Sequence, residues 1–234
     1  MRVLLPFLFT ILSLAPIVRA APTPTPADDE LTTLTRDDAA AEAAILAGDV
    51  DAALRYFAYS GHEQEAFARA SVEYRRARVA LRRAVRQTFG GPAWAQAAAD
   101  LGVEDDEPDP ARRSARREGD VLYVKMRGAR HEVPYVKSDG LWKVSVRDVL
   151  LTAVRARFGA DVAYEEADLF VLAGKMAKVM QGRAQDFSAL AGDVRGGRVR
   201  GRRELRDAVR RIRRAGTPAP ATPAPAQAPA GTRP

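Results

Sequence analysis

Two histidines are the residues whose type first suggests proton-transfer chemistry. His62 lies in the first turn of a predicted helix, and His131 starts a predicted strand beside Glu132. A histidine works as a general base when a carboxylate orients its ring, but neighbours on a strand point to opposite faces of the sheet. His131 and Glu132 therefore form no dyad within that strand, and we expect His62 to be a surface or capping residue.

Two acidic clusters have the residue types that bind metal ions. The run 104–107 lacks the ligand spacing and the turn glycine of a helix-loop-helix calcium site, so we expect a solvated, charged loop over 103–118. Glu165 and Asp168 share one face of a predicted helix, with Glu166 beside them. Because carboxylates also favour the start of a helix, we interpret this cluster as a helix start.

The short motifs of common catalytic and cofactor sites are missing from the sequence. It contains no HExxH pair, no GxSxG turn and no phosphate-binding glycine loop between a strand and a helix. It has no cysteine, which excludes disulfides, thiolate metal sites and a lipid-modified cysteine. We therefore predict no catalytic, cofactor-binding or metal-binding residue, and a binding role is preferred over an enzymatic one.

Arginines near the C-terminus form the one group with a functional pattern. Residues 195–214 hold ten arginines against Glu204 and Asp207, and the apolar residues of 202–214 fall on one side of a predicted helix. Such a helix can lie on an anionic surface; alternatively, its apolar side docks on the body of the protein and the arginines are solvated. The candidate contacts with an anionic surface are Arg198, Arg200, Arg202, Arg203, Arg206, Arg210 and Arg213.

The distribution of charge narrows the choice of partner. The net charge is +7, but residues 195–214 alone carry +8, and residues 21–194 carry about −4. A nucleic-acid-binding domain usually spreads its basic residues over one face, so nucleic acid is not expected. The expected partner is an anionic component of the cell envelope or an acidic protein. The sequence leaves the oligomeric state open.

Residues 1–20 predict a signal peptide. Arg2 precedes an apolar run from Val3 to Val18, and Val18-Arg19-Ala20 fits the small-residue pattern of a cleavage site. The run is shorter than the about 20 residues that a transmembrane helix needs. We expect cleavage before Ala21, export to the periplasm or the medium, and no transmembrane helix after cleavage; an uncleaved anchor is the alternative.

The rest of the chain divides by composition. Residues 21–29 predict a proline-rich spacer, and residues 217–234 predict a disordered Pro/Ala tail. Between them we expect a helical α+β domain over 30–194, with a strand meander near 120–147, and an arginine-rich amphipathic helix within 195–216.

Helix signals dominate the region from 30 to 214. The longest predicted helix has apolar residues that step by three and four from Phe67 to Leu81, and Trp94 and Trp142 are expected in the core. Capping residues such as Thr35, glycines and hydrophobic periodicity predict helices over 36–47, 50–59, 61–89, 92–101, 148–158, 161–194 and 202–214.

The hydrophobic period changes to two between residues 121 and 147. Three strands are predicted, over 121–126, 130–137 and 142–147, with a turn at Ser138-Asp139-Gly140. Pro134 is unfavourable in a central strand, so either this strand is bulged or the strand order is not the simple one. The expected fold class is α+β, mostly helical, with a small antiparallel sheet of about three strands packed on the long helix.

Two stretches resemble the nuclear transport factor 2-like superfamily. Residues 44–54 read AILAGDVDAAL, like the opening helices of that family, and residues 134–144 read PYVKSDGLWKV, like its later hairpin. The resemblance covers about residues 40–150 and is shared with bacterial exported members that carry a helical C-terminal extension. It implies helices packed against a curved antiparallel sheet, often around a pocket.

Our leading hypothesis is therefore a non-catalytic exported domain that binds a small ligand or a partner. The alternative is a binder of the cell-envelope surface that acts through the arginine-rich helix within 195–216.

Overall fold

The computed structural model describes residues 28–103, 109–127, 131–159 and 164–215. The predicted signal peptide and Pro/Ala tail, with nearly all of the predicted spacer, lie outside these residues. None of the described helices is long and apolar enough to span a membrane.

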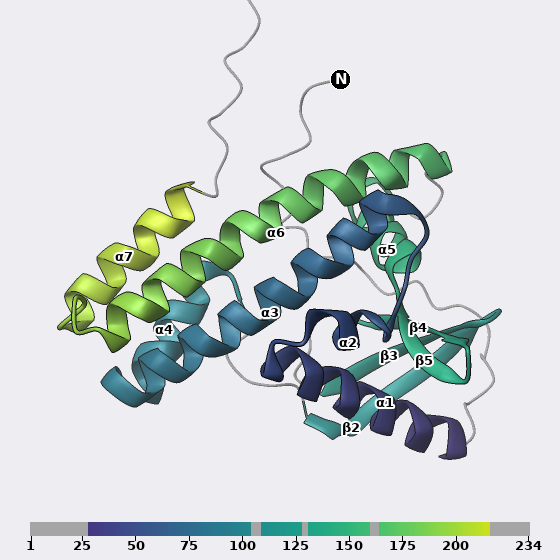
Figure 1. Cartoon of the computed structure of the whole chain (residues 1–234), viewed down its shortest axis with the longest axis horizontal. Helices are drawn as coiled ribbons and strands as arrows, with labels where there is room; N and C mark the ends of the chain where they lie inside the picture. Colours follow the sequence, from purple (N-terminus) through teal and green to yellow (C-terminus); the bar gives the residue numbers. More distant parts are fainter. Residues whose placement is uncertain (1–27, 104–108, 128–130, 160–163, 216–234) are drawn as a thin grey trace, which may run out of the picture.

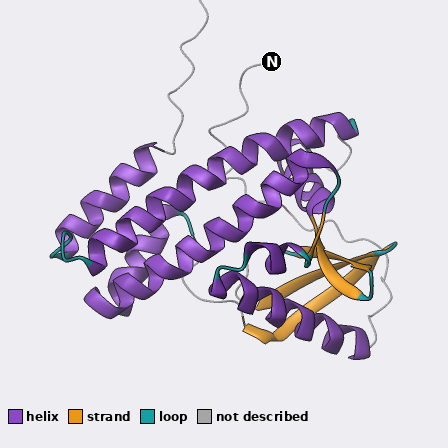
Figure 2. Ribbon diagram, in the orientation of Figure 1, coloured by secondary structure: helices purple, strands orange, loops and turns teal. Residues whose placement is uncertain are grey.

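The fold is α+β and mostly helical, with the strands gathered at one end of the molecule (Figure 2). The elements in chain order are α1 (Asp28–Ala47), α2 (Val50–Leu54), β1 (Phe57–Ala58), α3 (Gly61–Phe89), α4 (Gly91–Leu101), β2 (Asp109–Glu118), β3 (Val121–Arg127), β4 (Val133–Ser138), β5 (Leu141–Ser145), α5 (Val146–Phe158), α6 (Glu166–Arg195) and α7 (Arg202–Ala215).

The two long helices, α3 and α6, lie side by side and run in the same direction (Figure 1). The ring of Phe170 lies over Gly61 at their N-terminal ends. Farther along, the Tyr74 and Phe187 rings have centroids 5.5 Å apart. Parallel neighbours need a long return connection, which residues 90–165 supply with α4, the strands β2 to β5 and α5.

Each end of this helix pair carries its own hydrophobic cluster. At the C-terminal end, α4 and α7 complete a four-helix arrangement around Leu81, Trp94 and Phe187, which are all fully buried. At the N-terminal end, α5 packs on α3 and α6 through Val146 and Leu150. The helix pair therefore joins the α7 end to the sheet end.

The sheet has five strands in the order β1-β5-β4-β3-β2, with β1 parallel to β5 and the other pairs antiparallel. The predicted meander is present as β3, β4 and β5, but the predictions of about three strands and of a wholly antiparallel sheet were wrong. The prediction that the sheet packs on the long helix, α3, was also wrong, because α1 packs on the sheet. Leu34 of α1 lies against Leu122 and Trp142. These side chains fill the space between α1 and the sheet.

Strand β2 lies where a charged loop was predicted. It has no apolar alternation, and it pairs with β3 at the edge of the sheet. Ion pairs add to this backbone pairing: Arg116 binds Glu132 at 2.7 Å, and Arg117 binds Glu30 of α1 at 2.8 Å. Charged side chains on an edge strand also discourage pairing with a second chain.

Both alternatives predicted for Pro134 were wrong, because β4 pairs with β3 in regular register and the strand order β5-β4-β3 is consecutive. Pro134 pairs with Tyr123 of β3, whereas the pairing of β4 with β5 starts one residue later, at Tyr135 and Val144. The proline therefore lies beyond the part of β4 that has strands on both sides. The β4–β5 turn is made by Asp139 and Gly140, both with positive φ, as in a two-residue hairpin.

Several predicted element boundaries differ from the structure. Helix α1 begins at Asp28, within the predicted spacer; Thr35 is no N-cap, since its Oγ1 donates to the Leu31 carbonyl inside the helix. Helix α2 ends at Leu54, ahead of β1. Helix α5 begins at Val146, with Ser145 as its N-cap, and not near 148. The predicted helices over 61–89, 92–101 and 202–214 are confirmed within one residue.

Helix α1 supplies a hydrogen-bond acceptor to the edge of β5 that the short strand β1 leaves partly unpaired. Strand β1 is only two residues long, and Val144 of β5 donates its N–H to the Tyr56 carbonyl. The next N–H on that edge, at Trp142, donates to Oδ2 of Asp37 at 2.9 Å, and this carboxylate is 3% exposed. A side chain of α1 thus supplies an acceptor that the short strand cannot.

Replacing Asp37 is expected to destabilise the protein. Asp37→Ala leaves the buried Trp142 N–H without its acceptor, so the free energy of unfolding should fall by about 1–3 kcal/mol. Arg36, the ion-pair partner of Asp37, has a side chain that is 70% exposed, so Arg36→Ala should cost less than about 1 kcal/mol. Urea unfolding of both variants measures this; equal losses would show that the ion pair, and not the backbone contact, is what matters.

Candidate anion-binding site

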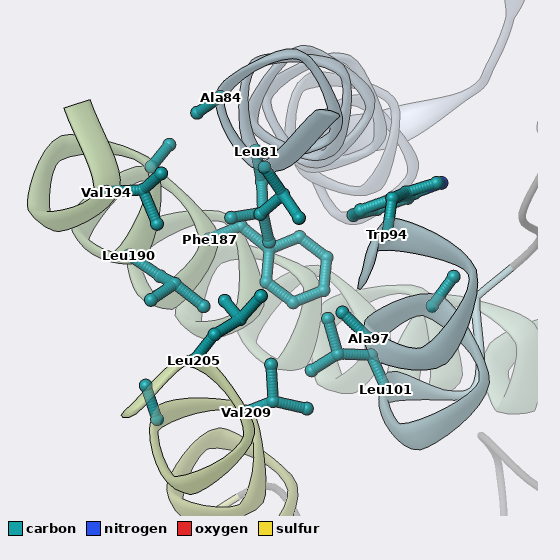
Figure 3. Packing of buried hydrophobic residues seen from close by; sticks show 14 of the residues in the cluster. Leu81, Ala84, Trp94, Ala97, Leu101, Phe187, Leu190, Val194, Leu205 and Val209 are labelled. Atoms are coloured by element: carbon teal, nitrogen blue, oxygen red, sulfur yellow. The ribbon is translucent and has the colours of Figure 1, made fainter. Parts of the chain in front are cut away.

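The arginine-rich helix α7 is docked on the body of the protein through its apolar side. Leu205 and Val209 point into the cluster formed with α3, α4 and α6 (Figure 3) and are 2% and 0% exposed. Ala208 is buried beside them, and Ile212 packs at the edge. Of the two alternatives left open by the sequence, the structure shows the docked one.

The arginines that precede α7 mostly bind the chain itself. Arg195 donates from Nε to the Ala191 carbonyl in the last turn of α6. Arg198 forms an ion pair with Asp193 at 2.5 Å. Arg200 donates from Nε to the Gly197 carbonyl at 3.3 Å, and its backbone N–H donates to the Glu204 carboxylate at 2.7 Å. These contacts fix the turn between α6 and α7, so Arg198 and Arg200 have a structural role.

Arg202, the first residue of α7, reaches the end of α3. Its Nη2 donates to the Phe89 carbonyl at 3.2 Å. Because α3 and α6 run parallel, their C-terminal ends lie at the same end of the molecule (Figure 1). The carbonyl ends of helices carry partial negative charge, which cations stabilise. Arg202 and Arg195 therefore complement the dipoles of this pair.

The rest of the α7 arginines are exposed on the sides of the helix that do not dock. Arg203, Arg206, Arg210 and Arg213 were predicted as surface contacts, and all four are exposed. Sequence reasoning omitted Arg211 and Arg214, although the same helical periodicity places them on the solvent side. We define the arginine face as Arg203, Arg206, Arg210, Arg211, Arg213 and Arg214, all exposed.

A groove of about 330 Å³ separates α7 from α4. Its floor is apolar, formed by Ala93 and Ala97 of α4 with Leu205 and Val209 of α7. Arg202 and Arg206 stand along the α7 side of the groove, and Pro92, Gln96 and Asp100 stand along the α4 side. No residue of this groove other than the arginines and the apolar α7 residues was singled out from the sequence.

A second charged cluster lies on the sheet. The Arg116 guanidinium stacks over the Tyr123 ring, 4.2 Å from its centroid, and binds Glu132. Burial, together with the negative charge of Asp148, raises the pKa of the Tyr123 phenol, so it stays protonated at neutral pH. Glu132 is engaged by Arg116, which gives this cluster a structural role.

The acidic residues at the start of α6 form a capping box. The Glu165 side chain accepts from the backbone N–H of Asp168, and the Asp168 side chain accepts from the Glu165 N–H. This confirms the interpretation as a helix start. Among the described residues, no group of three or more His, Asp or Glu side chains is arranged to hold a metal ion.

The docking of α7 can be tested through Val209. Val209→Ala removes two buried methyl groups, so the free energy of unfolding should fall by about 2 kcal/mol. The neighbouring Arg210 is exposed, and Arg210→Ala should change it by less than about 0.5 kcal/mol. Urea unfolding compares the two variants; equal effects would mean that the apolar side of α7 is not buried in solution.

No family model matches this chain, and no curated protein or solved structure matches it either.

Proposed function

We propose that this protein is a non-catalytic binding module that holds an anionic component of the cell envelope on the arginine face of α7. The observation that carries the proposal is the docking of Leu205 and Val209. Docking turns one side of the helix into core and leaves six arginines on the other.

The docking of α7 on the body determines which forces can bind an anionic surface. An amphipathic helix on a membrane buries its apolar side among the lipids, but in α7 that side is already occupied by α3, α4 and α6. Attraction then comes from charge alone. Fourteen residues of helix extend about 21 Å, a length over which several phosphate or carboxylate groups of an anionic surface can be contacted together.

The proposal includes the cellular location and the family. In this proposal, residues 1–20 are a signal peptide, and export brings α7 to the envelope. The rest of the proposal is that the body of the protein is a nuclear transport factor 2-like domain. A sheet of five strands with helices on it supports that resemblance better than the three strands expected from the sequence. Hydrophobic side chains pack between α1 and the sheet, which supports a binding site on α7 over one inside the fold.

Export has its own test. The N-terminal sequence of the protein recovered from outside the cytoplasm of its native host should begin at Ala21. Recovery of the protein only from the cytoplasm, with its original N-terminus, would contradict the proposed location.

The arginine face is tested by removing charge from it. Arg203, Arg210 and Arg214 are four and seven residues apart, so they lie along one line of the helix. A cation near an anionic surface contributes about 1 kcal/mol. Changing all three to Gln should therefore weaken binding to vesicles with anionic headgroups, or to an acidic polysaccharide, by about 100-fold, as measured by co-sedimentation at low salt. Comparison of the two targets identifies the source of the anionic groups.

A matched control removes the same charge elsewhere. Arg147, Lys175 and Lys178 are exposed and lie on α5 and the N-terminal half of α6. Changing them to Gln should weaken binding less than about threefold. Binding of the unaltered protein should also fall steeply between 0.1 M and 1 M salt, as the screening length shrinks from about 10 Å to about 3 Å. Equal losses in both triple variants, or binding that persists at 1 M salt, would contradict the proposal.

A further inference from the structure

The charged side chains of α7 are not distributed evenly around the helix. Successive residues of an α-helix are rotated by about 100°, so each residue of α7 can be placed relative to Leu205, which points into the core (Figure 3). On this scale six arginines lie together, between about 60° and 180° from Leu205. We define them as the basic flank: Arg202, Arg203, Arg206, Arg210, Arg213 and Arg214, all exposed.

The other flank of α7 carries its acidic residues. Glu204 and Asp207 lie there together with Arg211, at about 100° to 160° from Leu205 in the opposite direction. Two carboxylates and one arginine leave this flank with a negative net charge. The positive charge of α7 is therefore displaced to one side of the helix.

The basic flank is turned toward α4. Arg202 and Arg206 line the groove between α4 and α7, on the same side of α7 as Val209. This contact fixes the direction of the flank independently of the helical periodicity. The α4 side of the groove contributes Gln96 and Asp100 but no cation, so the arginines of α7 supply its positive charge.

A flat anionic surface cannot contact the whole basic flank. Such a surface touches a docked helix along the line opposite its docked side, and near that line lie Arg203, Asp207 and Arg214. Arg206 and Arg202 are rotated by about 80° and 120° from this line, toward α4. A flexible chain can follow the flank and reach them as well. The arrangement therefore favours a narrow, linear ligand over a flat one.

The cations of the basic flank are closely spaced. They occupy residues 202–214, a length of about 18 Å, which gives one cation for about every 3 Å of the helix axis. A polyphosphate has a negative charge on every phosphorus, whereas a whole sugar ring separates the carboxylates of an acidic polysaccharide. Guanidinium groups also bind phosphate oxygens through charge-assisted, often bidentate, hydrogen bonds. The spacing therefore favours a chain of closely spaced phosphates.

We propose that the ligand of α7 is a linear chain of phosphate groups that lies along the basic flank. This inference deepens the proposed function and rests on it, because it names the chemical class of the anionic component. It adds Arg202 to the binding residues and gives Arg211, on the other flank, a minor part. The contact is electrostatic and uses no apolar surface.

Polyphosphate of defined length is the probe, and isothermal titration at low salt is the measurement. A chain of about 14 phosphates should bind at least about tenfold more tightly than tripolyphosphate, because only the longer chain spans the flank. Polygalacturonate and oligothymidylate with the same number of charges should bind more weakly than polyphosphate, since their charges are farther apart. The logarithm of the binding constant should fall with the logarithm of the salt concentration with a slope of about −4, as six contacts predict.

Two variants of α7 that lose the same charge separate its flanks. Arg206→Gln should weaken polyphosphate binding about fivefold and make the salt slope shallower by about 0.7. Arg211→Gln should weaken it less than about twofold, because Arg211 lies on the far side of a helix about 10 Å wide. Arg147→Gln on α5 controls for the overall charge and should leave binding unchanged. All three side chains are exposed, so the variants should keep the fold.

Three outcomes would overturn this inference: no binding of polyphosphate at low salt, polygalacturonate or oligothymidylate binding as tightly as polyphosphate, or equal effects of Arg206→Gln and Arg211→Gln. The proposed function fails separately. If anionic vesicles or polysaccharide bind but the two α7 variants are equal, the proposed function stands and the linear phosphate ligand does not. If polyphosphate binding depends on Arg206 but the protein is recovered only from the cytoplasm, the ligand stands and the envelope function does not.

Discussion

The parallel packing of α3 and α6 is the constraint on which the rest of the structure depends. The two helices of 29 and 30 residues extend about 44 Å, and each end of the pair is completed by different elements. Because they run in the same direction, the chain must return between them, and the return carries α4, most of the sheet and α5. One topological requirement thus separates the molecule into a sheet end and an α7 end.

Parallel packing also places two helix C-terminal ends together. Their carbonyl groups concentrate partial negative charge, and the segment that follows α6 is rich in arginine. Arg195 and Arg202 bind carbonyls at these two ends, and Arg198 is paired with Asp193. The arginines of 195–214 therefore divide into a group that stabilises this end of the molecule and a group, the arginine face, that is turned to solvent. A count of the arginines in 195–214 does not distinguish these two groups.

The sequence predicted what depends on local pattern and missed what depends on distant partners. Helices α3, α4 and α7 have strong periodicity and clear breaks at Gly90 and Gly196, so their bounds agree with the prediction. Strand β2 has no apolar alternation; it pairs with β3, and Arg116 and Arg117 form ion pairs with Glu132 and Glu30, which a local pattern does not reveal. Strand β1 is too short to leave a periodic signal. At the site, the apolar and basic sides of α7 were visible in the sequence, but its docking and the groove beside α4 require the fold.

The central claim is that α7 is a docked part of the core and not a free amphipathic helix. Amide hydrogen exchange of α7 in the unbound protein tests it most directly. If Leu205, Ala208 and Val209 are packed against α3, α4 and α6, the amides of α7 should exchange slowly, with opening energies that approach global unfolding, as core helices show. Exchange of these amides at the rate of an unstructured peptide, with α3 and α6 still protected, would contradict the account.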